Sequence, residues 1–119
     1  MTDKKIVYLA APYSHKDFSV KVDRFERINK VAARLMLAGE VIFSPISQTH
    51  PIALAGGLPG DWQFWEKYDR AMLESCKELV VLMLDGWKES TGVTAEIKIA
   101  GELGIPVKYI EETVGEENG

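Results

Sequence analysis

Residues 78–104, ELVVLMLDGWKESTGVTAEIKIAGELG, set the architecture of this chain. The run from Leu79 to Leu84 is apolar at every position, which is typical of a strand covered on both faces. After a polar loop, apolar residues recur at helical spacing from Val93 onward, and Gly104 follows the last of them, where a helix commonly ends. We therefore predict a buried strand followed directly by a helix, the repeating unit of a parallel α/β sheet.

Glu96 interrupts the apolar stripe of that predicted helix, about one turn from its start. A carboxylate among apolar side chains is unfavourable unless it has a partner or a task. In open α/β sheets, ligands bind beyond the carboxyl ends of the strands, and Glu96 lies just past such an end. Glu96 is therefore our first candidate for a functional residue.

Other strands and helices alternate along the rest of the chain. The remaining patterns are strand-like at 4–10, 40–44 and 105–110 and helical at 20–38 and 61–76. Such alternation favours a parallel sheet with helices on both faces. We predict one three-layer α/β/α domain over residues 1–110, with a sheet of four or five parallel strands in the order 2-1-3-4, and an acidic tail over residues 111–119.

Two connections carry residues that are suited to contact a substrate. The first follows the strand at 4–10 and contains Pro12, Ser14 and His15. The second covers residues 45–60, is rich in Gly and Pro, and contains His50. A connection of that length without secondary structure is usually functional or mobile. We expect substrate contacts from both connections.

Composition and charge narrow the partners of the chain. A net charge of -4 and the lack of a Lys/Arg stripe argue against DNA or RNA. No apolar run approaches the ~20 residues that cross a bilayer, and the N-terminal segment turns polar too soon for a secretion signal. The single cysteine, Cys76, lies on the apolar face of the helix predicted at 61–76 and fits a reducing compartment. We expect a cytoplasmic protein.

A second acid is misplaced on the helix predicted at 61–76. Its apolar stripe consists of Trp62, Trp65, Met72, Leu73 and Cys76. Asp69 lies within this stripe, between Trp65 and Met72, rather than on the polar face. Two carboxylates, Asp69 and Glu96, thus interrupt apolar faces of two different helices.

Paired carboxylates suit chemistry at the anomeric carbon of a sugar, where one attacks and the other positions groups or transfers a proton. In this scheme Glu96 is the nucleophile, because the amides at the start of its helix favour its ionised form. Tyr8, near the end of the first strand, is placed to orient Glu96 by a hydrogen bond. Ser90, Thr91 and Gly92 present hydroxyl and backbone N–H groups to the 5′ end of a ligand. The scheme needs no cofactor and no metal.

Four short motifs resemble one known superfamily. They are YLAAPYS at 8–14, FSP at 43–45, WEKYD at 65–69 and STGVTAEI at 90–97. In this order they resemble the nucleoside 2-deoxyribosyltransferase-like superfamily, and within it a small bacterial family. The resemblance implies a flavodoxin-like domain that cleaves N-glycosidic bonds through a glutamate, matched here by Glu96. It also implies that Asp69 positions the sugar or handles protons at the leaving base and that Tyr8 hydrogen-bonds the nucleophile.

The chain departs from the superfamily pattern at several places. Ser90 stands where deoxyribosyltransferases often carry aspartate, and resembles a serine of the nucleotide N-hydrolase branch that contacts a 5′-phosphate. That branch has a Gly-rich first loop, whereas this chain has Ala-Ala-Pro at residues 10–12, and Lys98 replaces a motif glycine. The resemblance therefore leaves hydrolysis and transfer, and nucleoside and nucleotide, as open alternatives.

Two other classes of function are compatible with the residues. One is a non-catalytic nucleotide-binding module on the same fold, because a fold alone does not define a function. The other is a protein that docks a partner through its aromatic residues, which are Trp62, Phe64, Trp65 and Tyr68. Exposed aromatic residues would also favour a homo-oligomer.

Overall fold

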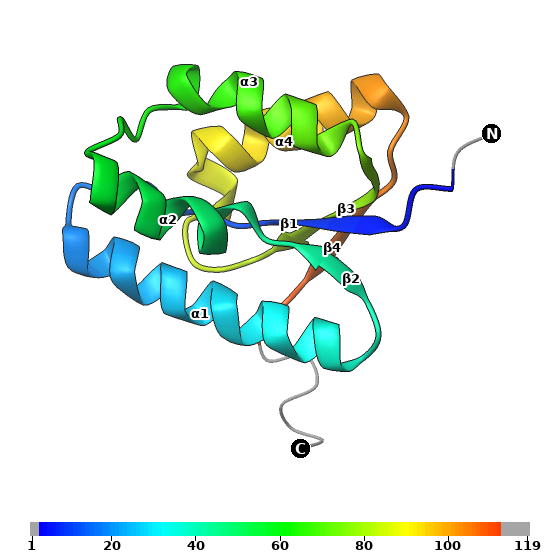
Figure 1. The fold of residues 1–119 in the computed structure, drawn as a ribbon, viewed down its shortest axis with the longest axis horizontal. Helices are drawn as coiled ribbons and strands as arrows, with labels where there is room; N and C mark the ends of the chain where they lie inside the picture. Colours follow the sequence, from blue (N-terminus) through cyan, green and yellow to red (C-terminus); the bar gives the residue numbers. More distant parts are fainter. Residues whose placement is uncertain (1–2, 113–119) are drawn as a thin grey trace.

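The computed structural model describes residues 3–112 and has a four-stranded parallel sheet between two layers of helices (Figure 1). The strands are β1 (Ile6–Ala10), β2 (Val41–Phe43), β3 (Cys76–Leu82) and β4 (Val107–Ile110). The helices are α1 (Phe18–Leu37), α2 (Pro45–Gly56), α3 (Trp62–Leu73) and α4 (Thr91–Leu103), with a short 3-10 turn, η1 (Trp87–Glu89), before α4. The strand order β2-β1-β3-β4 confirms the predicted order and the flavodoxin-like fold class.

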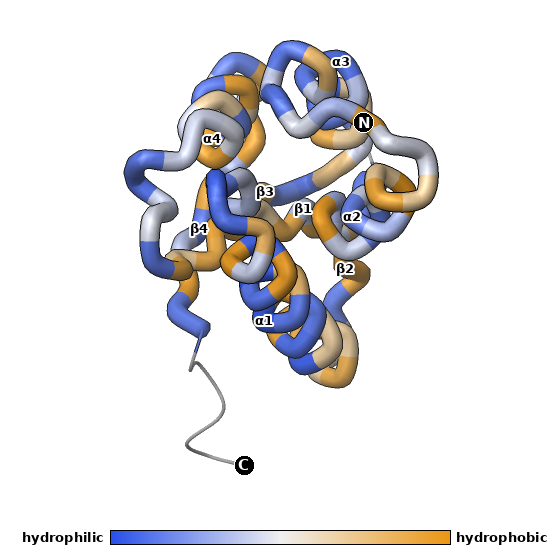
Figure 2. Tube along the Cα trace, turned by 90° about the vertical axis from the view of Figure 1, so that its left-hand side faces the viewer, coloured by the Kyte–Doolittle hydropathy of each residue, from blue (hydrophilic) through white to orange (hydrophobic). Residues whose placement is uncertain are grey.

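The two central strands are buried because both of their faces carry apolar side chains. Along β1, Val7 and Leu9 face a core that includes Ile28 of α1. Tyr8 and Ala10 point to the opposite face, where α3 and α4 complete a second core. Figure 2 shows this arrangement, with hydrophobic segments along the strands, α1 on one side of the sheet and α3 and α4 on the other. The side chain of Tyr8 therefore emerges beneath the two helices that carry the misplaced acids.

The segment predicted as a loop over residues 45–60 is mostly helical, so that prediction was wrong. Residues 45–56 form α2, which begins with a proline at a position that lacks an intrahelical acceptor and ends at Gly57 with a φ of 64°. Pro51 lies inside the helix, and this residue, which normally breaks helices, obscured the pattern. The helical signal was nonetheless present, because the cavity-facing residues Ile46, Thr49, His50 and Ala53 have the spacing of one helix face.

The helix predicted over residues 61–76 begins as expected but ends early. Asp61 caps α3 by accepting a hydrogen bond from the backbone N–H of Phe64, at 3.3 Å. Cys76 does not lie on the helix but opens β3, where it pairs with Ile6 of β1. The thiol is buried as predicted, and burial raises its pKa to about 11. Cys76 is therefore a core residue in its neutral form at physiological pH.

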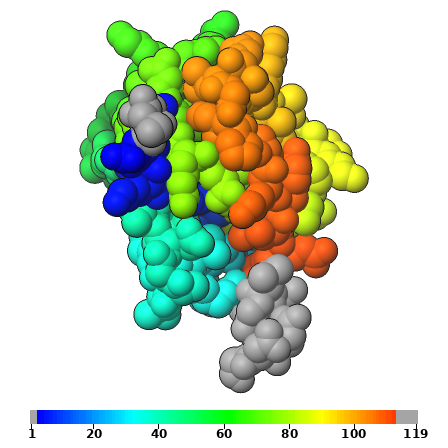
Figure 3. All heavy atoms as spheres, turned by 90° about the vertical axis from the view of Figure 1, so that its right-hand side faces the viewer, coloured from blue at the N-terminus to red at the C-terminus, as the bar shows by residue number. Residues whose placement is uncertain are grey.

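The end of the sheet away from the site is closed by chain connections. Figure 3 views this side, on which the N-terminal segment lies beside the start of β3, next to the α4–β4 connection. Near the other terminus, Arg27 forms an ion pair with Glu112, the second residue of the predicted acidic tail, at 2.8 Å. The rest of that tail, residues 113–119, lies outside the described residues. Within residues 3–112, every helix is too short or too polar to cross a bilayer.

Candidate functional site

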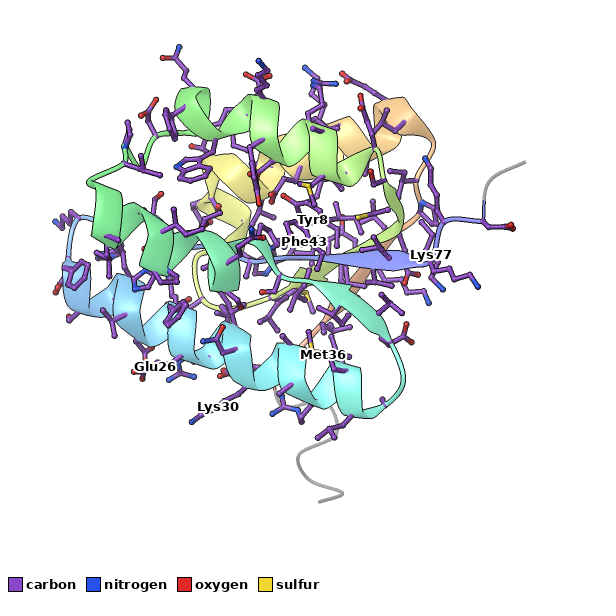
Figure 4. All side chains as sticks on the ribbon, viewed as in Figure 1. Tyr8, Glu26, Lys30, Met36, Phe43 and Lys77 are labelled. Carbon is purple, nitrogen blue, oxygen red and sulfur yellow. The ribbon has the colours of Figure 1, made fainter. Side chains whose placement is uncertain are left out.

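The centre of the site is a buried hydrogen bond between a tyrosine and a glutamate. The hydroxyl of Tyr8, from the middle of β1, donates to Oε2 of Glu96, from α4, at 2.6 Å. Both residues are buried, with exposed fractions of 0% and 6%. Tyr8 is held from the side by Phe43 of β2, whose ring centroid lies 5.7 Å away, and Figure 4 shows the two side chains next to each other above the sheet. The predicted contact of Tyr8 with Glu96 is thus present.

Asp69 of α3 joins this pair. Burial raises the pKa of Asp69 to about 6, although hydrogen bonding with Glu96 and Tyr8 works in the opposite direction. An interaction of this kind requires the two carboxyl groups to be close neighbours. The two acids that interrupt separate helical faces therefore converge over β1, as the sequence pattern suggested.

Glu96 is not kept ionised by its helix, in contrast to the expectation from the helix dipole. Burial raises its pKa well above the ordinary value, and the charge of Asp69 adds to the effect. The residue is a turn and a half into α4, beyond the first turn in which the dipole acts. The hydrogen bond from Tyr8 lowers the pKa but does not outweigh burial. Both pKa shifts therefore favour the protonated form of the acid pair.

A cavity of about 550 Å³ opens over the acid pair. Asp69 and Glu96 form part of its wall, together with residues from α1, α2, α3 and the start of α4. The cavity lies beyond the carboxyl end of β1, at the point where the strand order changes direction between β1 and β3. Parallel α/β sheets commonly bind their ligands at such a point. Its volume is in the range of small-molecule sites. The arrangement can therefore hold a ligand against two carboxyl groups.

The start of α4 forms one wall of this cavity. Ser90, Thr91 and Gly92 all line it. The Ser90 hydroxyl accepts a hydrogen bond from the N–H of Val93 at 3.2 Å, so it caps the helix. Helix geometry leaves the amides of Thr91 and Gly92 without intrahelical acceptors. These three predicted residues are therefore brought together, and the two amides are suited to hydrogen-bond a ligand.

The loop after β1 contributes less than the sequence suggested. Ser14 lines the cavity, and its hydroxyl donates to the carbonyl of Gly60 at 3.3 Å. Pro12 is fully buried and is not among the residues that line the cavity. His15 is exposed, and its Nδ1 accepts from the backbone N–H of Asp17 at 3.0 Å. Only Ser14 of these three predicted residues borders the cavity.

Residues of α1 and the preceding loop form a wall that sequence reasoning did not assign. Tyr13, Phe18 and Lys21 line the cavity beside His50 of α2. Tyr13 is hydrogen-bonded to Nδ1 of His50, and the ammonium group of Lys21 lies 5.7 Å from the centre of the Tyr13 ring. The sequence signal for this wall was the helical spacing within α2, which directs His50 toward α1.

The aromatic residues of α3 divide between the cavity and the surface. Trp62 and Trp65 line the cavity, and the Trp65 indole N–H donates to the carbonyl of Pro59 at 2.8 Å. Phe64 is 45% exposed, and its ring lies 5.0 Å from that of Trp65 in an edge-to-face arrangement. Trp62 and Trp65 therefore face the cavity, whereas Phe64 is mainly exposed.

The charges around the cavity are mainly negative. Among the described residues that line it, the acids are Asp61, Asp69, Glu89 and Glu96, and the only lysine or arginine is Lys21. Within residues 3–112, no group of three or more His, Cys, Asp or Glu is arranged to hold a metal ion.

The fold and the site define a flavodoxin-like α/β protein with an acid pair over the central strand β1 of its sheet. A family model described as "Domain of unknown function (DUF1937)" matches residues 5–112, and the chain belongs to this family. A comparison with curated proteins finds no match.

Proposed function

We propose that this protein cleaves the N-glycosidic bond of a nucleoside or nucleotide through a covalent Glu96 glycosyl-enzyme. The supporting observation is the buried Tyr8–Glu96 hydrogen bond, with Asp69 beside it, on the wall of a cavity of nucleoside size. The four motifs that resemble the nucleoside 2-deoxyribosyltransferase-like superfamily point to the same chemistry. Membership of that superfamily is part of the proposal.

In this mechanism the two acids have different roles. Glu96 attacks C1′ of the sugar and forms a C1′–O bond, while the electron pair of the C1′–N bond leaves with the base. The base takes the proton that Asp69 holds. This distribution requires the proton to move from Glu96 to Asp69 before the attack, because burial and the charge of Asp69 raise the pKa of Glu96 well above its ordinary value, whereas the pKa of Asp69 is raised to about 6. The hydrogen bond from Tyr8 stabilises the Glu96 carboxylate that this transfer produces. Water or a second base then releases the sugar from Glu96.

The amides of Thr91 and Gly92 would hold the 5′ end of the ligand. They lie on the same cavity wall as Glu96, which follows them in α4. A ligand anchored there would extend its sugar along the helix toward the acid pair. Binding of the 5′ end would in this way hold C1′ of the sugar next to Glu96. Positioning of the reacting atoms is a general source of rate enhancement.

A non-catalytic binding module is the second candidate, and one observation favours it. Glu96 is 6% exposed, and its pKa is raised by burial. A protonated Glu96 would donate a hydrogen bond to a ligand without attacking it. In that case the acid pair would recognise a sugar hydroxyl rather than cleave a bond.

Incubation with a panel of 2′-deoxynucleosides and their 5′-monophosphates, followed by mass spectrometry of the intact protein, tests the proposal. We expect the mass of one deoxyribosyl group or its phosphate to be added, and free base to appear. Glu96→Gln should abolish both. Glu102→Gln is the matched control, because Glu102 lies on the same helix but is exposed.

The two candidates give different results. Base release that is lost in Glu96→Gln and kept in Glu102→Gln supports the enzyme. Binding of the same compounds without base release or adduct supports the module. Adduct formation that survives Glu96→Gln would contradict the assignment of the nucleophile.

A further inference from the structure

His50 occupies a constrained position on the cavity wall formed by α1 and α2. Its side chain is buried, with an exposed fraction of 5% for the residue. The imidazole stacks on the ring of Phe25, with centroids 4.2 Å apart and planes 27° apart. Phe18 lies at 6.3 Å and 20°, and Tyr13 contacts the imidazole edge-on at 5.4 Å. Three aromatic rings therefore fix the plane of the imidazole.

One ring nitrogen of His50 is used inside the protein, and the other is open. Nδ1 is hydrogen-bonded to the Tyr13 hydroxyl, and Nε2 makes no hydrogen bond within residues 3–112. In the same part of the chain, no fully buried side-chain nitrogen or oxygen lacks a hydrogen-bond partner. Nε2 therefore reaches solvent, and the solvent-filled space that His50 borders is the cavity.

The environment of the pair determines which nitrogen carries the proton. Burial, assisted by the charge of Lys21, lowers the pKa of His50, so the imidazole is neutral at pH 7. Burial raises the pKa of Tyr13, so the phenol keeps its proton and acts as the donor to Nδ1. The remaining proton of the neutral ring then lies on Nε2. The cavity wall thus presents a neutral N–H donor of fixed direction.

We infer that His50 and Tyr13 form a nucleobase subsite, in which Nε2–H of His50 donates a hydrogen bond to a ring nitrogen or carbonyl oxygen of a purine or pyrimidine. Flat aromatic walls combined with an N–H donor suit a heteroaromatic ring, and the cavity also carries Phe18, Trp62 and Trp65. The inference rests on the proposed function for the class of ligand. During cleavage this hydrogen bond would strengthen as the base gains the electron pair of the C1′–N bond, whereas the proton that the base takes comes from Asp69.

Nitrogen NMR of the imidazole tests the subsite without requiring activity. The chain has two histidines, so His15→Gln leaves His50 as the only imidazole, and Glu96→Gln in the same protein blocks turnover. A long-range ¹H–¹⁵N spectrum identifies the protonated nitrogen. The probes are adenine, 2′-deoxyadenosine and 2′-deoxycytidine, with 2-deoxyribose as the base-free control. We expect the proton on Nε2, and a shift of this resonance with the three base-containing probes only.

Substitution of His50 tests the contribution of the donor to affinity. His50→Phe keeps an aromatic ring among Phe18, Phe25 and Tyr13 but removes the N–H group. We expect about a tenfold loss of affinity for 2′-deoxyadenosine, the value of one hydrogen bond. His50→Gln keeps an N–H donor and should recover part of that loss. Circular dichroism melts establish whether each variant is folded. If His50→Phe does not fold, the NMR experiment on the protein that retains His50 still tests the subsite.

The outcomes separate this inference from the proposed function. A proton on Nδ1, or a Nε2 resonance that does not move with any base-containing probe, overturns the subsite. A response of His50 in the NMR experiment, combined with no glycosyl adduct and no base release from the protein that retains Glu96, supports the subsite and contradicts the glycosidase. Adduct formation at an unchanged rate, with unchanged affinity, in His50→Phe supports the glycosidase and overturns the subsite.

Discussion

At the scale of single residues, the main feature is the placement of two acids where they destabilise the fold. A buried carboxylate loses its hydration, and two neighbouring carboxyl groups also repel each other when both are ionised. Burial raises the pKa of both Glu96 and Asp69, and the charge of Asp69 raises the pKa of Glu96 further. Proteins retain such arrangements at functional sites, where activity depends on groups that reduce stability. The acid pair should therefore affect the stability of the protein as well as its activity.

Whether stability rises or falls with pH follows from the direction of the two pKa shifts. The folded pKa of Asp69 is about 6, above its ordinary value of 3.8, and the shift of Glu96 is in the same direction. The folded protein therefore binds more protons than the unfolded chain. The stability that Asp69 contributes is fully present below its ordinary pKa and is lost as the pH rises through about 6. The contribution of Glu96 changes with pH in the same direction. For Asp69 alone the loss is on the order of 3 kcal/mol.

Glu96→Gln should therefore stabilise the protein at pH 8 and have much less effect at pH 5. The amide of glutamine carries no charge, and its oxygen still accepts the hydrogen bond from Tyr8. Urea unfolding across pH 5 to 8 measures the difference, with the exposed Glu102→Gln as a control that should show no such dependence. A stability difference that is independent of pH would mean that the acid pair does not hold a proton in the folded state.

At the scale of elements, α4 combines a structural role with a functional one. Its start is capped by Ser90, so the helix begins two residues before the apolar pattern at Val93, and Gly104, with a φ of 72°, confirms the predicted C-terminal limit. The same first turn forms a wall of the cavity. A β-carbon added at Gly92 would lie 4.0 Å from the Ser90 hydroxyl and from the Trp62 ring, an ordinary contact distance. Packing within the protein therefore does not require glycine at this position.

Gly92→Ala should weaken ligand binding without destabilising the fold. The added methyl group would project between two groups that line the cavity, in the space proposed for the 5′ end of the ligand. Gly101→Ala is the matched control, because it lies in the same helix with no atom within 4 Å of its added β-carbon. We expect both variants to gain up to about 1 kcal/mol from helix propensity, and only Gly92→Ala to lose affinity for 2′-deoxynucleosides, by about tenfold.

Calorimetric titration and thermal melts on the two variants measure these effects. Equal affinity in Gly92→Ala and Gly101→Ala would contradict a ligand contact at the start of α4. A loss of stability in Gly92→Ala alone would mean that the glycine is needed for folding.

At the scale of the whole molecule, the cavity collects charge from several elements. Asp61 and Asp69 come from the start and the body of the α3 region, and Glu89 and Glu96 flank the start of α4. Lys21 of α1 is the only ammonium group among the described lining residues. A cavity lined mainly by one sign of charge concentrates its field inward. The excess of acidic over basic side chains around this cavity disfavours a ligand that carries a doubly charged phosphate.

We therefore predict that 2′-deoxynucleosides bind more tightly than their 5′-monophosphates, by about tenfold at low salt. The comparison is made in Glu96→Gln protein, where turnover is blocked, by calorimetric titration. The difference should narrow in high salt because ions screen the acids at the rim. Adding Glu89→Gln should raise the affinity for monophosphates, whereas Glu66→Gln, on an exposed position outside the cavity, should not. Tighter binding of monophosphates in the starting protein would contradict this selectivity.

Local patterns predicted most of the fold. The continuous apolar run of β3, the caps at Asp61 and Ser90, and the glycine after α4 are local features, so they can be identified without tertiary information. The prediction failed at α2, where Pro51 and the neighbouring glycines obscured a helical stripe, and at Cys76, where an apolar residue after a helix was read as part of it. In both places the structure depends on packing against α1 or β1, which a short window of sequence does not contain.

For the site, the sequence by itself determined that Asp69 and Glu96 are acids on apolar helical faces and that Tyr8 lies on a neighbouring strand. Only the tertiary structure decided that these three residues meet, that burial raises the pKa of both acids, and that His50 borders the same cavity from α2. The physical reason is that residue type and periodicity are local properties of the chain. Desolvation and the approach of groups far apart in the sequence arise only when the helices pack on the sheet.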